Sequence, residues 1–115
     1  MTKPTIIFAA LLTMNAAAQS QTTGDQWIAL CAKGVPPLER ASCESYARGV
    51  ADAVLVAQRV SPEMPPICIP PGATGSDLTA LALPYLEGQP ADARKVVAAA
   101  LLMDAFRAAF PCPRK

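Results

Sequence analysis

Histidine is absent from this chain of 115 residues, and aromatic residues make up only 5% of it. Without imidazole, Ser–His–Asp and Cys–His nucleophiles and histidine-ligated metal sites are excluded. The formal net charge of +1 gives no electrostatic reason to bind nucleic acid or an anionic membrane surface. The scarcity of aromatic rings also argues against a platform for stacked bases. An enzyme or a nucleic-acid-binding protein is therefore a poor interpretation of this composition.

Apolar residues and proline are plentiful instead. Hydrophobic residues make up 52% of the chain and charged residues 17%, and there are 12 prolines. This balance is typical of a packed globular core and not of a disordered chain. The length allows a single domain.

The first 18 residues have the features of a secretory signal peptide. Lys3 precedes an uncharged, mostly apolar run over residues 5–14, and the small residues Ala16, Ala17 and Ala18 follow. This order predicts cleavage after Ala18. The apolar run is shorter than the roughly 20 residues that span a bilayer. The residue directly after the predicted cut is Gln19 and not a cysteine, so a lipoprotein anchor is also excluded. We expect an exported domain over residues 19–115, without a membrane anchor.

Four cysteines lie in the predicted exported part, at Cys31, Cys43, Cys68 and Cys112. An even number of cysteines in an oxidising compartment predicts two structural disulfides. A metal site or a redox-active motif is disfavoured, because the chain has no C-x-x-C pair and no histidine. Four cysteines allow three pairings, between which the cysteine pattern alone does not decide.

Helical signals dominate the rest of the chain, and no segment reads convincingly as a strand. Apolar residues recur every three or four positions in four stretches, at about 25–32, 43–60, 74–88 and 91–109. Ser42 is the expected N-cap of the second stretch, and Thr74 that of the third. Between these two helices, residues 61–72 contain five prolines, which exclude both helix and central strand.

These elements predict an all-α fold, a small four-helix domain of two helical hairpins joined by a proline-rich connector. The first hairpin brings Cys31 near Cys43, and the second returns Cys112 toward Cys68. We therefore favour the disulfides Cys31–Cys43 and Cys68–Cys112. The apolar face of the fourth helix is wide enough to pack on the other helices and also on a second subunit.

An ordered set of motifs runs through the predicted domain. Residues 43–52 read C-x-x-Y-x-x-G-x-x-D, with Tyr46, Gly49 and Asp52 after the cysteine. The later members of the set are Cys68-Ile69-Pro70, Tyr85-Leu86 with Pro90, and Phe110-Pro111-Cys112. This order resembles the Tai/Rap immunity-protein family of Gram-negative bacteria. Ser45 departs from the pattern, where a glycine commonly precedes the tyrosine, and so does Pro84 within the third helix.

The resemblance implies a small helical protein of the periplasm, held by disulfides and without catalytic activity or cofactor. Members of the family include antidotes that block cell-wall amidase effectors delivered by type VI secretion, and some act as homodimers. The partner implied is therefore a peptidoglycan amidase. The alternative is a periplasmic stress chaperone of the small helical acid-stress type. The two disulfides and the proline connector argue against the large opening that such a chaperone needs.

Each motif residue also has a structural interpretation. Tyr46 is expected to be a core aromatic. Gly49 is expected to allow close helix packing or a tight contact with the tryptophan region, and Asp52 to be a solvated charge or a structural acceptor. Pro70 and Pro111 read as disulfide anchors and helix stops. For partner contacts we expect Glu87 and Gln89, in the exposed turn between the third and fourth helices.

Overall fold

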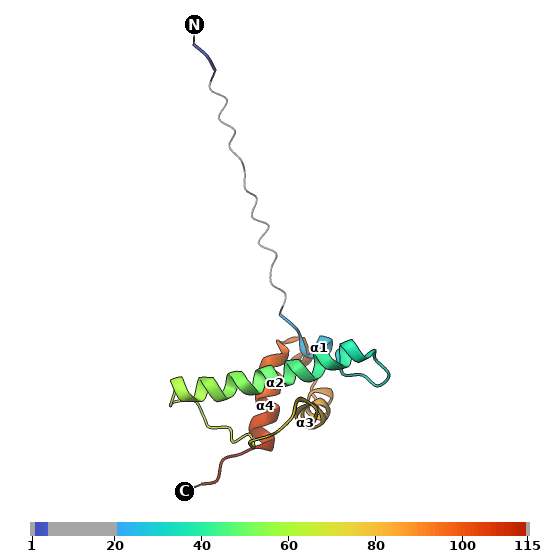
Figure 1. Ribbon diagram of the computed structural model, residues 1–115, viewed down its shortest axis with the longest axis vertical. Helices are drawn as coiled ribbons and strands as arrows, with labels where there is room; N and C mark the ends of the chain where they lie inside the picture. The colour runs from blue at the N-terminus through green and yellow to red at the C-terminus, as the bar shows by residue number, and fades with distance from the viewer. Residues whose placement is uncertain (1, 5–20, 115) are drawn as a thin grey trace.

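The computed structural model describes residues 2–4 and 21–114, and most of the predicted signal peptide therefore lies outside the described residues. Four α-helices and one short 3-10 helix follow one another (Figure 1). They are α1 (Gly24–Leu30), α2 (Pro37–Val60), α3 (Gly75–Glu87), η1 (Ala93–Lys95) and α4 (Ala98–Ala109). In the described part of the chain, β structure is limited to two isolated bridges, Thr23–Val97 and Ile67–Pro111. The predicted all-α fold is confirmed.

The long helix α2 organises the domain, because it packs against each of the other three α-helices. It crosses α4 steeply, and its C-terminal end extends beyond the rest of the bundle (Figure 1). The predicted proline connector leads from that end back to α3. The core lies between the four helices, and each contributes large, fully buried side chains. These are Trp27 from α1, Val54 from α2, Leu78 and Leu86 from α3, and Leu102 and Phe106 from α4.

Two of the helices begin at a complete capping box. At α1 the Thr23 hydroxyl accepts from the Gln26 N–H, and the Gln26 side chain accepts from the Thr23 N–H. At α3, Thr74 and Asp77 make the same pair of bonds, as predicted from the sequence. Each box satisfies two N–H donors that the first turn of a helix leaves without partners.

The predicted start of the second helix at Ser42 is wrong. The helix begins at Pro37, and Ser42 lies inside it, where its hydroxyl donates to the Leu38 carbonyl. Pro36 is the N-cap and Pro37 the first helical residue. A proline fits the first helical position well, because its missing N–H would have had no partner there. The two prolines that end the first hairpin's loop therefore also start α2.

The predicted start of the fourth helix near Ala91 is also wrong. Residues 91–97 form η1 and an extended stretch, and α4 begins at Ala98. Tertiary hydrogen bonds hold this stretch open, since Gly24 N–H donates to the Val96 carbonyl and Ala98 N–H to the Thr22 carbonyl. Val96, one of the apolar residues in the predicted fourth helix, consequently lies outside α4 and is 48% exposed. Hydrogen bonds to Thr22 and Gly24, at the N-terminal end of the domain, therefore override the helical periodicity of this segment.

Candidate functional site

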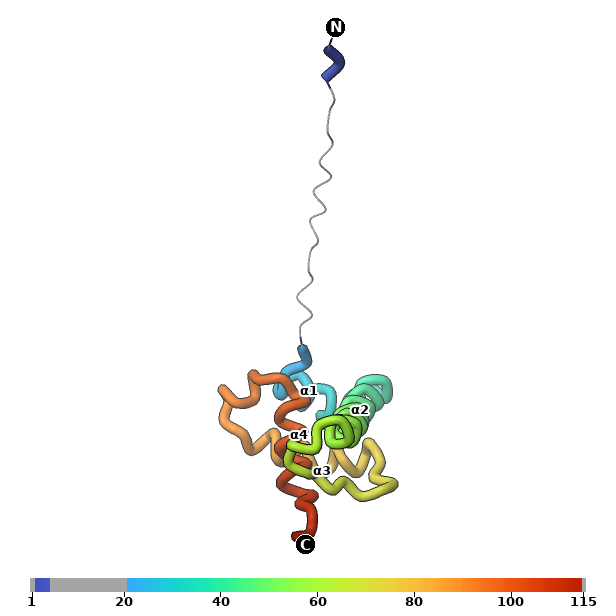
Figure 2. The backbone as a smooth tube through the Cα atoms, turned by 90° about the vertical axis from the view of Figure 1, so that its left-hand side faces the viewer, coloured from blue at the N-terminus to red at the C-terminus, as the bar shows by residue number. Residues whose placement is uncertain are grey.

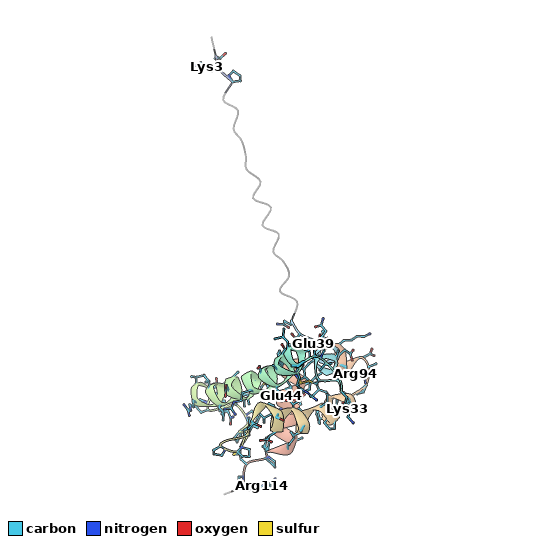
Figure 3. All side chains as sticks on the ribbon, turned by 45° about the vertical axis from the view of Figure 1, so that its right-hand side comes forward. Lys3, Lys33, Glu39, Glu44, Arg94 and Arg114 are labelled. Carbon is cyan, nitrogen blue, oxygen red and sulfur yellow. A yellow bond between two sulfur atoms is a disulfide. The ribbon has the colours of Figure 1, made fainter. Side chains whose placement is uncertain are left out.

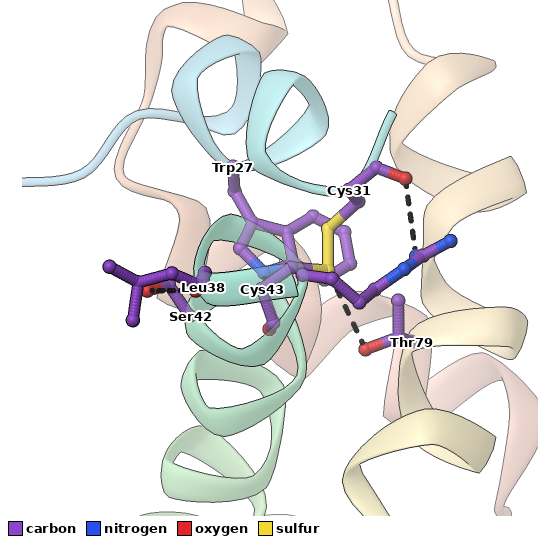
Figure 4. The surroundings of a disulfide bond; sticks show 7 residues. Trp27, Cys31, Leu38, Ser42, Cys43 and Thr79 are labelled. Atoms are coloured by element: carbon purple, nitrogen blue, oxygen red, sulfur yellow. Dashed lines mark hydrogen bonds between the residues drawn. A yellow bond between two sulfur atoms is a disulfide. The ribbon is translucent and has the colours of Figure 1, made fainter. Parts of the chain in front are cut away.

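Both predicted disulfides are present, and the described residues contain no free cysteine. Cys31–Cys43 lies in the core beside Trp27, and Figure 4 shows the indole ring against the disulfide. The Thr79 hydroxyl of α3 lies 3.9 Å from Cys43 Sγ and is the donor, because a disulfide sulfur carries no hydrogen. This disulfide joins α1 to α2 and faces α3, so it is a structural element of the core.

The second disulfide, Cys68–Cys112, fastens the connector to the C-terminal segment. Cys68 N–H donates to the Phe110 carbonyl at 2.9 Å, and the adjacent Ile67 pairs with Pro111. Gln58 of α2 holds the same segment, because its side chain accepts from Ile67 N–H at 2.9 Å and donates to the Ile67 carbonyl at 3.2 Å. Pro70 and Pro111 are exposed on either side of this disulfide. Their role as disulfide anchors stays a prediction.

The three motif residues of α2 lie away from that disulfide. Tyr46 is half-buried and packs against the core. Asp52 is exposed and forms an ion pair with Arg48, whose Nη2 lies 3.0 Å from Asp52 Oδ1. Arg48 also donates through Nη1 to the Ala73 carbonyl, which ties α2 to the start of α3. Asp52 is thus both a solvated charge and an acceptor that orients Arg48.

Within the domain, Gly49 makes neither the close helix packing nor the tight contact with the tryptophan region that the sequence predicts, so both of these predictions are wrong. Gly49 is exposed, and a Cβ built there would meet no atom within 4 Å. The glycine that α2 approaches closely is Gly75, where a Cβ would lie 2.6 Å from the Glu44 carbonyl oxygen. Gly75 and Gly49 line one open hollow of ≈ 480 Å³ between α2 and the start of α3, together with Arg48 and Asp52.

Of the predicted contact residues, Glu87 is the last residue of α3 and Gln89 lies between α3 and η1. We call residues 87–92 the α3–α4 turn. Glu87 is exposed at the end of α3, whereas Gln89 is half-buried and donates to the Tyr85 carbonyl at 3.2 Å. Figure 2 shows the segment between α3 and α4 projecting on the opposite side of the domain from α2. The structure therefore does not bring Glu87 and Gln89 together with the motif residues of α2.

Within the described residues, no group of three or more Cys, Asp or Glu side chains is placed to hold a metal ion. The described helices include none that is long and apolar enough to cross a membrane. Among the described residues, the one carboxyl whose pKa clearly departs from its ordinary value is that of Asp77. The Thr74 backbone N–H and hydroxyl lower the pKa of Asp77, with desolvation opposing them weakly. Asp77 is a helix-capping residue, so this shift belongs to local structure.

The fold defines a small all-α protein that is stabilised by two disulfides. The disulfides indicate an oxidising compartment outside the cytoplasm. The family model described as Rap1a immunity proteins matches residues 23–112. The chain belongs to this family, whose members are not catalytic. No curated protein and no solved structure matches the chain.

Two residues that organise these surfaces were missed from the sequence. Gln58 recognises both polar groups of the Ile67 backbone, and Arg94 contacts α1 and the end of α3. Each is a long polar side chain between an alanine and a basic residue, Arg59 after Gln58 and Lys95 after Arg94. A polar residue in such a position is usually solvated, and only the tertiary structure shows the backbone groups that these two reach.

Proposed function

We propose that this chain is a periplasmic immunity protein that binds a cell-wall amidase effector delivered by type VI secretion. Residues 1–18 act as its cleavable signal peptide. Membership of the Rap1a family supports the immunity function, and the two disulfides support an oxidising compartment. Inhibition is steric, because the protein needs no chemistry of its own to fill a partner's active site.

The observation that carries this mechanism is the fixed, exposed α3–α4 turn. Glu87, Gly88 and Pro90 are exposed, whereas the backbone on either side is hydrogen-bonded to the domain. A loop that is already ordered before binding loses little conformational entropy in the complex. Glu87 supplies a free carboxylate, and Gln89 can exchange its bond to Tyr85 for one to the partner. We propose that both residues contact the amidase.

A double substitution tests this site. Replacing Glu87 and Gln89 with alanine should change the free energy of unfolding by less than about 1 kcal/mol, since both lie at the surface. Inhibition of the cognate amidase effector should weaken tenfold or more, equal to about 1.4 kcal/mol of binding free energy. Glu63→Ala, in the exposed connector, is the control. Unchanged inhibition would remove the turn from the site, and failure to bind that amidase would contradict the proposed function.

A second copy of the chain is the other partner we propose, and it packs on the outer face of α2. This face consists of exposed residues only: Leu38, Ser42, Ser45, Gly49, Ala53, Val56 and Val60. Leu38 and Val60 are 79% and 75% exposed and lie at equal distances along the helix from Gly49. An antiparallel pair of α2 helices, crossing at Gly49, would therefore place each Leu38 beside the partner's Val60.

The small residues at the centre of this face allow two α2 backbones to approach closely, while the larger side chains at its ends pack together. Figure 2 places α2 opposite the α3–α4 turn, so a dimer formed through α2 leaves that turn free. Gly49→Cys tests the arrangement, because the two introduced thiols would meet at the symmetry axis. We expect a disulfide-linked dimer in a non-reducing gel, and none for Asp104→Cys on the exposed side of α4. Equal behaviour of the two variants would contradict this interface.

The chaperone alternative predicts that the domain opens and exposes its core. Both disulfides oppose this motion, because Cys31–Cys43 joins α1 to α2 and Cys68–Cys112 joins the connector to the end of α4. A comparison of saturable amidase binding with suppression of aggregation by the same sample would separate the two functions. We expect the first and not the second.

A further inference from the structure

The guanidinium group of Arg94 contacts both the α3–α4 turn and the first turn of α1. Arg94 Nε lies 3.0 Å from Asp25 Oδ1 of α1. Its Nη1 lies 3.2 Å from the Gln89 carbonyl oxygen and 3.4 Å from that of Glu87. Figure 3 places Arg94 at the end of the domain where the chain enters, far from Arg114. The two residues predicted to contact the partner are therefore held through their own backbone by Arg94.

The electrostatics of these contacts suit a cation. The last carbonyl groups of a helix have no intrahelical donor and carry partial negative charge. Glu87 ends α3, and the Arg94 guanidinium supplies hydrogen bonds and positive charge there. Asp25 on the far side keeps the guanidinium in place with its carboxylate. A lysine carries its three N–H donors on a single nitrogen, so it lacks the planar set of separate nitrogens with which Arg94 reaches these three acceptors.

Backbone hydrogen bonds also hold the residues that follow the α3–α4 turn. Arg94 N–H donates to the Pro90 carbonyl at 3.1 Å, and Gly24 N–H donates to the Val96 carbonyl at 2.9 Å. Gly24 is packed so tightly that a Cβ there would lie 2.9 Å from the Arg94 carbonyl oxygen. The backbone of the segment is thus fixed on both sides of the Arg94 side chain. The Arg94 side chain additionally holds the exposed α3–α4 turn, which precedes it in the chain.

We propose that Arg94 is the positioning residue of the effector-binding site, and that with Asp25 it holds the α3–α4 turn in its binding shape. The inference rests on the proposed function of that turn. The turn projects from the domain, so the partner surface that it fits is a cleft and not a flat face. Arg94 acts through the Glu87 and Gln89 carbonyls, and the side chains of Glu87 and Gln89 make the contact.

A role in global stability alone predicts something different. The Arg94 and Asp25 side chains are 30% and 53% exposed, and ion pairs so exposed contribute little to stability. Loss of Arg94 should therefore loosen the turn without lowering the melting temperature appreciably. The matched control is Arg107→Gln, which removes an equally charged side chain paired with Asp104 on the surface of α4.

The first experiment measures amide hydrogen exchange and amidase affinity for Arg94→Gln and Arg107→Gln. We expect faster exchange over residues 86–96 and an amidase Kd about tenfold higher for Arg94→Gln only, because the turn must now be ordered on binding. Unchanged exchange in the turn would overturn the inference. Faster exchange with an unchanged Kd would overturn it as well, since the turn would then be held for stability alone.

The second experiment repeats Arg94→Gln in the background of the Glu87→Ala, Gln89→Ala double variant. If Arg94 acts through these residues, the further change in Kd should be less than about twofold. A full, multiplicative loss would show that Arg94 touches the partner itself and would overturn its positioning role. Failure of the proposed function is distinguishable from both results, because the wild-type protein would then show no amidase binding at all.

Discussion

The indole Nε1 of Trp27 donates a hydrogen bond of 3.1 Å to the backbone carbonyl of Cys43. Trp27 is fully buried, and the disulfide to Cys31 starts from the same residue that accepts this bond. Helix α1 has only 7 residues and is too short to be stable alone. The tryptophan and the disulfide together therefore hold α1 on α2.

Trp27→Phe should destabilise the domain by about 2–4 kcal/mol. The substitution removes buried volume and the only side-chain donor that reaches the Cys43 carbonyl among the described residues. Denaturant unfolding of the oxidised protein measures the loss, with Tyr46→Phe at the half-buried position as the control. A loss below about 1 kcal/mol for Trp27→Phe would show that the indole is not an anchor of α1.

Replacing each of the two glycines of the α2–α3 hollow with alanine should have opposite effects on stability. At Gly75 a Cβ would lie 2.6 Å from the Glu44 backbone oxygen, so a helix must move. Gly75→Ala should cost about 1–3 kcal/mol. At Gly49 the space is open, and alanine has the higher helix propensity. Gly49→Ala should therefore stabilise the monomer by about 0.5–1 kcal/mol. Thermal unfolding of the two variants compares them directly, and effects of the same sign would contradict the structure.

These glycines also show what a sequence can predict here. The helices, the connector and the disulfide pairing follow from local signals: apolar spacing, proline positions and capping residues. Local signals do not predict which glycine is closely packed, because whether Gly49 or Gly75 faces another helix depends on how α2 and α3 cross. The start of α4 likewise depends on the pairing of Val96 with Gly24, residues far apart in the chain. Arg94 was missed for the same reason.

The two disulfides should differ in their resistance to reduction. Cys31 and Cys43 are buried, whereas Cys68 is exposed and Cys112 half-buried. A thiolate must reach a disulfide sulfur to reduce it, so mild dithiothreitol should open Cys68–Cys112 first. Alkylation followed by peptide mapping should find Cys68 and Cys112 modified while Cys31 and Cys43 remain joined. Early modification of Cys31 or Cys43 would contradict the burial of the first disulfide.

Opening Cys68–Cys112 should also lower stability without destroying the helices. The disulfide closes a loop with a sequence separation of 44, and the chain-entropy treatment assigns such a loop about 4 kcal/mol. The half-reduced protein should therefore keep its helical circular dichroism at 25 °C and unfold at a clearly lower denaturant concentration. An unchanged midpoint would show that Gln58 and the Ile67–Pro111 bridge hold the connector without the disulfide.

The capping box of α3 should make stability depend on pH. The Thr74 backbone N–H and hydroxyl lower the pKa of Asp77 below its ordinary value of 3.8. The folded state thus favours the carboxylate, and its contribution is fully present above the unfolded pKa and lost as pH falls through the lower folded pKa. Asp77→Asn should reduce the melting temperature at pH 7, and the difference from wild type should shrink toward pH 2. The box of α1 is the control, because Gln26 does not titrate: Gln26→Ala should cost the same at both pH values. A constant difference for Asp77→Asn would show that its carboxylate does not cap α3.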